Sequence, residues 1–446
     1  MTRRQIAEQR FLPGMSPGLV RVAEAAQRNP GRLLSLAHHI DVDALRRAYY
    51  RIRANAAVGV DGVTKEDYGE NLEPNLRDLH QRLKSMSYRH QVIMRAHIDK
   101  GGGKTRPIGI SAFEDKVVQD SLRELLGAIY EQDFLDCSYG FRPGRSAHDA
   151  LQALNGAVHR GEVNVVLEAD IVSFFDRIDR RKLKQLLEQR LADKSLMRLI
   201  GKCLHVGVLE GGVETSPDLG TVQGSTLSPI LANVYLHHVL DVWFETDVKP
   251  ALEGKANLVR YADDFVIGIE RPEEAEHVLT LLSKRLAAFG LELHPEKSRL
   301  VDFRRPSGGQ RRGKGPGTFD LLGFTHYWRC SRRGRWYMTT KTSRSRQRRA
   351  IKSVYAWCRR HRHQSVPAQH QALRRKLNGH YNYFNVRGNS AAMGRLAYHA
   401  RRARLKWLLR RSQRSRLNWD RFNDLLRDFP LSAPRVGTSL WATREP

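Results

Sequence analysis

Two adjacent aspartates interrupt a segment that otherwise has the composition of β-strands. The stretch LVRYADDFVIG spans residues 258–268, and Asp263 and Asp264 lie in its middle, between apolar and aromatic residues. This pattern predicts a strand, a turn and a second strand, with both aspartates at the tip of the hairpin. Buried charge is unfavourable unless it is paired or bound to a metal. The chain must therefore fold so that this tip meets compensating positive charge.

A third carboxylate follows another strand-forming run. NVVLEADIVSFFD, residues 164–176, is rich in β-branched residues, and Asp170 ends its first strand-like part. An Asp-Asp pair alone, or an Asp after a strand, is usually a turn or cap residue. Three carboxylates on strand ends of one sheet could instead converge on two divalent cations, and oxygen ligands suit Mg²⁺. Two such ions activate a hydroxyl nucleophile and stabilise a leaving pyrophosphate.

Positive charge is concentrated in the last quarter of the chain. The net charge of the 446 residues is +29, but from Arg329 onward there are 30 Lys and Arg against 4 Asp and Glu. No acidic residue occurs between Asp320 and Asp420. Short basic runs are usually solvated helix faces, whereas an acid-free segment of this length needs a polyanion to offset its self-repulsion. Interleaved tyrosines and tryptophans suit base stacking beside phosphate contacts, so nucleic acid is the expected partner.

The order of the expected elements predicts an α+β fold, because strands are joined both by helices and by hairpins. Helical spacing is found over residues 114–131 and 273–289, and a turn followed by a long helix is expected over 223–245. No apolar run is long enough to span a membrane, and the N-terminus lacks the apolar core of a signal peptide. A cytoplasmic protein is therefore expected. The four cysteines are too scattered to predict a zinc module or a disulfide framework.

Taken together, the motifs resemble the reverse transcriptase of group II introns. In the family's order they are KGGGKTRPIGI (100–110), SYGFRPGRSAHDAL (138–151), ADIVSFFD (169–176), QGSTLSPILANVYLHHVLD (223–241), YADD (261–264), GLELHPEKS (290–298) and FDLLGFTHYW (319–328). LNGHYNYFNVRGN (377–389) is similar to the maturase, or thumb, domain of these proteins, and residues 408–426 and 431–440 are similar to their short tail. The resemblance runs from about Gly59 to about residue 440.

The resemblance implies a polymerase of right-hand architecture. It places an N-terminal extension and fingers at 1–165, a palm with an antiparallel sheet and the catalytic site at 166–328, a basic, mainly helical thumb or maturase domain at 329–415, and a basic tail at 416–446. The implied activity is RNA-directed DNA synthesis with two Mg²⁺ ions, together with binding of intron RNA in splicing and retrohoming. The implied partners are structured intron RNA, an RNA template with a DNA primer, target DNA and dNTPs.

Two other functions remain open from the sequence. One is a maturase that only binds RNA for splicing, against which the intact set of aspartates speaks. The other is a host-adopted enzyme that copies nucleic acid in defence or repair. Many relatives also carry a C-terminal, zinc-associated HNH nuclease. No Cys/His cluster precedes Pro446, so cleavage of the second DNA strand is not expected of this chain.

The resemblance also assigns roles to individual residues of the catalytic centre. Asp170, Asp263 and Asp264 would hold the metal ions, assisted by the backbone carbonyl of Ile171. Phe175 would act as a steric gate against a ribose 2′-hydroxyl. The alternative is that Phe174 and Phe175 are both core residues, although neighbours on a strand face opposite sides.

Further residues are expected around the nucleotide and the primer. Gln223 and Gly224 would line the nucleotide pocket, although a Gln-Gly pair alone is merely a turn. Arg106, with Lys100 or Lys104, would reach the triphosphate, unless this loop is simply solvated. Lys297 would be a general acid toward pyrophosphate, or only a surface lysine. Primer and template contacts would come from Arg142, Arg145, Tyr261, Leu322, Gly323 and Phe324, although the apolar character of the last three alone would indicate core residues.

Basic residues of the C-terminal region complete the expected sites. The expected RNA contacts are Arg344, Arg346, Arg348, Arg349, Arg374, Arg375, Lys376, Arg401, Arg402 and Arg404. On the helix that carries the last of them, Leu396, Ala400, Ala403 and Trp407 share a face that is expected to be core. His148 and Asp149 are not expected to form a catalytic dyad, because adjacent helical residues diverge by about 100°. The sequence departs from the family at Val222 and Ser225, where Pro and Gly are frequent, and no Pro precedes Lys100 in this motif.

Overall fold

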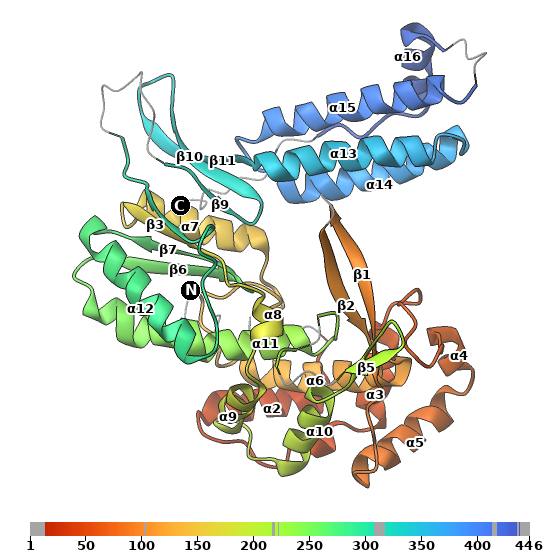
Figure 1. The fold of residues 1–446 in the computed structure, drawn as a ribbon, viewed down its shortest axis with the longest axis vertical. Coiled ribbons are helices and arrows are strands. Elements are labelled where there is room, and N and C mark those ends of the chain that lie inside the picture. The colour runs from red at the N-terminus through yellow and green to blue at the C-terminus, as the bar shows by residue number, and fades with distance from the viewer. Residues whose placement is uncertain are drawn as a thin grey trace.

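The computed structural model describes residues 14–101, 104–215, 219–221, 223–306, 317–412, 417–434 and 437, with the backbone alone at 99–101 and 104. The strands of this part of the chain form three sheets, and a group of long C-terminal helices lies at one end of the molecule (Figure 1). The mixture of helices and mostly antiparallel sheets confirms the predicted α+β class.

Helices build most of the N-terminal region. They are α2 (Pro17–Arg28), α3 (Val42–Arg51), α4 (Lys65–Glu70), α5 (Leu72–Lys84) and α6 (Phe113–Tyr130). Ser16, Asp41 and Thr64 cap the first three through side-chain bonds to backbone amides, as N-cap residues do. Almost all of α6 is buried, so this helix, expected over 114–131, is the axis around which the others pack.

A long hairpin rises from these helices toward the C-terminal end (Figure 1). Its strands β1 (Ile93–Gly101) and β2 (Lys104–Ile110) pair antiparallel, and residues 104–110 of the glycine-rich motif KGGGKTRPIGI form its second strand. The short strand β4 (Val208–Glu210) extends this sheet in parallel with β1, and β5 (Val213–Thr215) follows it. We call these four strands the hairpin sheet.

A second, antiparallel sheet has the strand order β6-β7-β3-β8, and we call it the carboxylate sheet. Its strands are β6 (Ala256–Tyr261), β7 (Asp264–Ile269), β3 (Val165–Ala169) and β8 (Arg299–Asp302). Alternate residues face two cores: Leu167 and Ile267 pack in one, Val166 and Val266 in the other. Helix α7 (Ala147–His159) belongs to the second core, and α9 (Arg180–Glu188), α10 (Lys194–Leu204), α11 (Ser228–Leu236) and α12 (Ala275–Ala288) to the first.

The segment after β3 differs from the expectation. The strand ends at Ala169, Ser173 takes a left-handed conformation (φ 46°), and the single helical turn α8 (Phe174–Arg177) begins there. Phe174 and Phe175 are both buried, at 2% and 8% exposure. Neighbours on a strand face opposite sides, and the two rings were expected to do so. This expectation was wrong, because the backbone here is helical and not extended.

The helix that follows the Gln-Gly turn is continuous but not uniform. Helix α11 has Pro229 in its first turn, as expected, and passes into π-helical turns η2 (His237–Val242) and η3 (Phe244–Val248). Short 3₁₀ turns occur at η1 (Ala37–His39), η4 (Lys249–Ala251) and η5 (Pro272–Glu274).

The C-terminal region consists of a small sheet and a helical bundle. Strands β9 (Phe319–Leu321), β10 (Phe324–Cys330) and β11 (Trp336–Thr342) form the order β11-β10-β9. The C-terminal bundle contains α13 (Arg344–Arg360), α14 (Val366–Phe384) and α15 (Ser390–Leu409), and α16 (Trp419–Asp428) packs on it through Phe422. The expected core face of α15 is confirmed, because Leu396, Ala400, Ala403 and Trp407 are all buried. Among the helices described, none has both the length and the apolar character needed to cross a membrane.

Candidate active site

The ladder between β3 and β7 brings two of the three expected carboxylates together. Its last pair is Ala169 with Phe265, so Asp170 and Asp264, the next residue on each strand, lie opposite one another at the same sheet end. Asp264 begins β7, Asp263 lies in the turn, and Tyr261 pairs with Asp264 across the hairpin. The predicted placement of both aspartates at a hairpin tip is confirmed.

The turn that carries Asp263 is held by its surroundings. Ala262 has a φ of 58°, in the left-handed region that a residue with a Cβ rarely adopts. Gly140 packs directly against it, since a Cβ on Gly140 would lie 2.3 Å from the Ala262 nitrogen. The Tyr139 amide also donates to the Arg260 carbonyl at 2.8 Å. The loop of the SYGFRPG motif therefore supports the aspartate turn through its backbone.

A buried arginine joins this support, and the sequence did not single it out. The Arg260 guanidinium is fully buried beside the equally buried Asp241 and donates to both of its carboxylate oxygens. It also donates to Asn233 Oδ1 at 3.0 Å, to Ser138 Oγ at 2.7 Å and to the Ala262 carbonyl at 3.1 Å. Arg260 thus ties the aspartate turn to η2 and to the SYGFRPG loop. The sequence did contain a signal for this role, since Arg260 lies among apolar and aromatic residues in the stretch LVRYA.

Crowding of carboxylates changes their protonation. Loss of water around the carboxylate, followed by the negative charges of Asp263 and Asp170, raises the pKa of Asp264 to about 6. The Asp264 residue nevertheless remains exposed, so the part due to lost water is smaller than full burial would give. The pKa of Asp263 is raised by the same causes, while Arg106 and Arg260 oppose the increase. These carboxylates lack sufficient positive charge within the protein.

Lys297 supplies one of the missing charges. Its Nζ lies 2.6 Å from Asp170 Oδ2, so it is not a remote surface lysine. Among the described residues, no three Asp, Glu, His or Cys side chains gather closely enough to hold one metal ion. The Asp170 carboxylate is directed to the ammonium instead. The His294 amide donates to the Asp170 carbonyl and the Val172 amide to the Glu292 carbonyl, and these bonds do not engage the Ile171 carbonyl.

A cavity of about 420 Å³ opens beside Asp170 and Asp264. Leu322 and Gly323 line it, and Arg346 and Arg349, expected as RNA contacts, line it as well. The Leu322 carbonyl accepts a bond from the Tyr383 hydroxyl at 2.9 Å, which fixes this segment against α14. Asp170 and Asp264 therefore share a cavity with the first turns of the C-terminal bundle.

The residues expected around the nucleotide also meet. Arg106 Nε donates to Gln223 Oε1 at 2.7 Å, and the Gly109 amide donates to the Gln223 carbonyl at 2.6 Å. Gly224 has a φ of 109°, and a Cβ there would lie 2.5 Å from the Gly109 oxygen. Only glycine lets this segment approach β2 so closely. Ser225 donates to Gln119 Oε1 at 3.0 Å.

Phe175 lies next to the segment that leads to Gln223. The Thr221 amide donates to the Phe175 carbonyl at 2.7 Å. Its ring makes an edge contact with Phe174, and 8% of the residue remains exposed. The side chains of Lys100 and Lys104, and Val222 as a whole, lie outside the described residues.

Three expected contact residues are placed inside the protein. Arg142 is buried and donates to Glu131 Oε2 and to the carbonyls of Leu135 and Ser138. Arg404 is 1% exposed and donates to the Phe429 carbonyl. The Phe324 side chain is fully buried against α14. The prediction that these side chains touch nucleic acid was wrong, because charge or motif position was judged without burial.

The other expected contacts remain at the surface or close to it. Arg145 is half-buried and donates to the Asp136 carbonyl at 3.0 Å, and Tyr261 is half-buried. His148 Nε2 donates to the Tyr383 carbonyl while Asp149 caps α7, so the two do not act as a dyad. The expected RNA contacts that are exposed are Arg344, Arg346, Arg348, Arg349, Arg374, Arg375, Lys376, Arg401 and Arg402.

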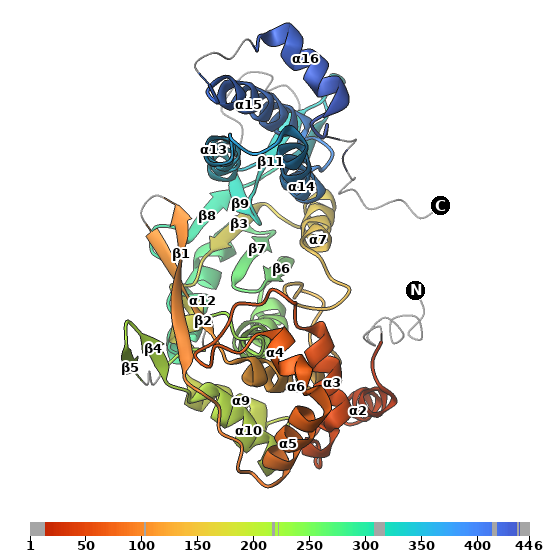
Figure 2. The same cartoon turned by 90° about the vertical axis from the view of Figure 1, so that its right-hand side faces the viewer.

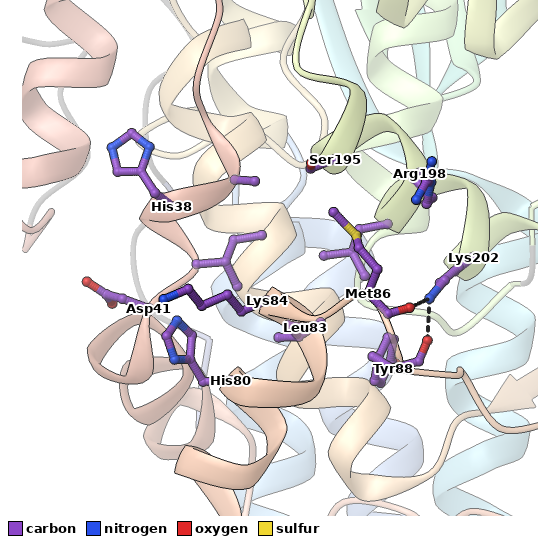
Figure 3. Close-up of a pocket in the computed structure, with 13 residues that line it drawn as sticks. His38, Asp41, His80, Leu83, Lys84, Met86, Tyr88, Ser195, Arg198 and Lys202 are labelled. Carbon is purple, nitrogen blue, oxygen red and sulfur yellow. Dashed lines mark hydrogen bonds between the residues drawn. The ribbon is translucent and has the colours of Figure 1, made fainter.

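A separate cavity of about 460 Å³ lies between η1, α5 and α10 (Figure 3). Its polar groups are used within the protein: Lys202 donates to the carbonyls of Met86 and Tyr88, and Asp41 caps α3. None of its lining residues belongs to the carboxylate centre. The cavity at Asp170 and Asp264 is therefore the one associated with the expected metal ligands.

Comparison with known proteins agrees with this geometry. Residues 98–326 match the reverse transcriptase (RNA-dependent DNA polymerase) family. The group II intron-encoded protein LtrA of Lactococcus lactis subsp. cremoris is 34% identical over 300 residues, which are 64% of this chain and 50% of that protein. Protein YkfC of Escherichia coli (strain K12) is 34% identical over 239 residues, 47% of this chain and 62% of that protein.

A plant relative extends the comparison. Nuclear intron maturase 2, mitochondrial, of Arabidopsis thaliana is 28% identical over 242 residues, 44% of this chain and 30% of that protein. The chain spans about half the length of the LtrA proteins that it matches. The resemblance predicted from the motifs is confirmed: the chain belongs to the reverse transcriptase family and is similar to its group II intron-encoded members.

Proposed function

We propose that the protein is an RNA-directed DNA polymerase of right-hand architecture that also binds intron RNA as a maturase. The hairpin sheet with the N-terminal helices would be the fingers, the carboxylate sheet the palm and the C-terminal bundle the thumb (Figure 1). The observation that carries the proposal is the register that sets Asp170 opposite Asp264, with Asp263 between the strands.

The donor set fits Mg²⁺, which prefers carboxylate and carbonyl oxygens and keeps sites for phosphate. Asp170, Asp263 and Asp264, with the Ile171 carbonyl, would hold two ions. The raised pKa values of Asp263 and Asp264 agree with a site that needs added positive charge. When bound, the ions would neutralise charge on the attacking 3′-hydroxyl and the leaving pyrophosphate. Asp170 would first have to exchange its contact with the Lys297 ammonium.

The protein's own groups would then position the substrates. Arg106, held by Gln223, would contact the triphosphate, and Gly224 lets the Gln223 segment approach β2 closely. Lys297 lies 2.6 Å from Asp170, and from there it would donate a proton to the leaving pyrophosphate. Phe175 would exclude a 2′-hydroxyl from the same pocket. The backbone of Leu322 and Gly323 lines the side where a primer end would lie.

Charge supports the maturase part of the proposal. The thumb and tail carry 30 Lys and Arg against 4 acidic residues, and most of the expected basic contacts are exposed. A structured RNA offers the polyanion that this surface requires. Splicing and insertion of the copied intron at a DNA target are proposed on this surface together with the similarity to intron-encoded proteins.

Primer extension on an RNA template with Mg²⁺ tests the proposal. Asp263→Ala should abolish dNTP incorporation and keep RNA affinity, because it removes a metal ligand and no phosphate contact. Asp78→Ala, which removes an exposed carboxylate on α5, is the control and should retain both properties. Incorporation by Asp263→Ala would refute the metal assignment. A wild-type protein that binds RNA but never extends a primer would favour a splicing-only maturase.

A further inference from the structure

An open groove lies on the outer side of the thumb, between α13, α15 and the first residue of α16. It has a volume of about 490 Å³. Tyr355 and Trp419 line it with Arg402, Lys406 and Arg410, and Leu409 contributes apolar surface. We call this site the outer groove.

The outer groove is separate from the catalytic cavity. Arg346, which lines the catalytic cavity, and Tyr355 are nine residues apart on α13, or about 14 Å along the helix axis. In both views of the molecule, α15 and α16 lie on the side of the bundle that is farthest from the palm (Figures 1 and 2). A primer and template bound at the carboxylates would leave this side free.

The groove combines exposed aromatic rings with cations. Trp419 is 49% exposed and Tyr355 is 37% exposed, which is unusual for large aromatic side chains of a folded domain. The Lys406 ammonium lies 5.2 Å from the Tyr355 ring centre, and the Arg401 guanidinium lies 5.7 Å from that of Trp419. Each ring is thus a stacking platform with positive charge beside it.

The chemistry of these platforms selects the ligand. Unpaired bases have free faces that stack on aromatic side chains while their phosphates meet Lys and Arg. A duplex hides those faces, and an acidic peptide would use the charges without the rings. The described lining of the groove contains no acidic residue; α16 carries Asp420, Asp424 and Asp428, whereas α13 and α15 contain none.

We infer that the outer groove binds unpaired nucleotides of an RNA while the catalytic cleft holds primer and template. The inference rests on the proposed function, because that function gives DNA a place in the cleft and gives RNA a second anchor. The two platforms would hold one or two splayed bases, and Arg402, Lys406 and Arg410 would contact the phosphates between them. The RNA would then remain attached to the thumb during copying.

The test uses the full chain with its cleft saturated by a chain-terminated primer on a short RNA template. The affinity of a labelled oligoadenylate RNA is then measured for the wild type and for the double variant Tyr355→Ala/Trp419→Ala. Loss of two stacking platforms should weaken binding on the order of 10- to 100-fold. Primer extension by the same variant on a minimal primer–template should be unchanged. Circular dichroism and a thermal melt establish that the variant is folded.

Controls separate stacking from charge. Tyr50→Ala removes a still more exposed aromatic side chain from α3 and should leave both measurements unchanged. Equal oligoadenylate affinity of wild type and double variant would overturn the inference. So would a matched RNA duplex, the deoxyoligonucleotide or polyglutamate binding as tightly as the RNA, since these would indicate a basic surface, a DNA site or a protein site. If the wild type binds the oligonucleotide at this groove but extends no primer, the proposed polymerase function is refuted and the RNA-binding role of the outer groove is supported.

Discussion

Arg260 offers the sharpest test of how the fold holds the catalytic turn. Replacing it with methionine keeps much of its volume but leaves the Asp241 carboxylate in a fully buried site without its partner. Breaking a buried ion pair by removing one member costs about 3–5 kcal/mol. The same change removes the donors to Ser138, Asn233 and the Ala262 carbonyl. Arg260→Met should therefore destabilise β6, β7 and the turn between them.

The double variant Arg260→Met/Asp241→Leu separates stability from activity. Removing both charges together eliminates the isolated carboxylate, so much of the lost stability should return. The donor to the Ala262 carbonyl stays absent, and the left-handed turn that carries Asp263 loses its anchor. Incorporation should therefore remain about 10-fold or more below wild type, since small displacements of catalytic groups are costly.

Two measurements decide the matter. Hydrogen exchange of the β6 and β7 amides reports the local free energy of opening, which suits a protein that need not unfold in one step. Single-turnover extension of a DNA primer on an RNA template reports the chemical step. The reasoning would be refuted if Arg260→Met lowered the opening free energy by less than about 1 kcal/mol, or if the double variant recovered wild-type incorporation.

Three further outcomes follow from the structure. Phe175→Ala should lower discrimination against ribonucleotides at least about tenfold in competitive primer extension. Phe174→Ala, which also removes a buried ring, should lower the stability of the fold alone. Equal selectivity in the two variants would exclude Phe175 as the steric gate. Gly224→Ala forces a Cβ against the β2 backbone. It should reduce kcat/KM for dNTPs on the order of 100-fold without weakening RNA affinity. A kcat/KM near that of the wild type would contradict the need for this close approach. Burial lowers the pKa of both His237 and His326 to about 3, so the unfolded chain binds more protons than the folded chain below pH 6.5. The free energy of unfolding should therefore be greatest above pH 6.5 and fall by about 1.4 kcal/mol per pH unit per histidine as the pH drops. Denaturant midpoints that do not change between pH 6.5 and pH 4 would contradict this.

The placement of the aspartates was predictable because it depends on short-range pattern. The apolar, strand-forming runs on both sides of the aspartates indicated the hairpin, and the antiparallel pairing of β3 with β7 sets Asp170 opposite Asp264. Glycines with a specific role, such as Gly224, could be located by motif. Their physical reason, a close approach to the Gly109 backbone, needed the structure.

Burial of charged groups was the main source of error. Arg404 follows Ala400 by four residues and Leu396 by eight, so helical spacing alone would have placed it near the core face of α15. The partner of Arg142 is Glu131, outside the motif that suggested a nucleic-acid contact. The Arg260 cluster joins Ser138, Asn233 and Asp241 from distant parts of the chain. Sequence patterns identify such charged residues but do not predict which of them pair in the folded protein.

The contact between Gly109 and Gln223 gives the hairpin of β1 and β2 a fulcrum. It fixes the root of β2, and five residues of extended chain, about 17 Å, separate it from Lys104 near the tip. A rotation of about 10° at the fulcrum moves the tip by about 3 Å, with the strand acting as a rigid arm. Gln223 also holds Arg106, so the same residue forms the fulcrum and orients the side chain proposed to contact the nucleotide. Substitutions at this fulcrum should therefore alter the speed of closure and the grip on the nucleotide together.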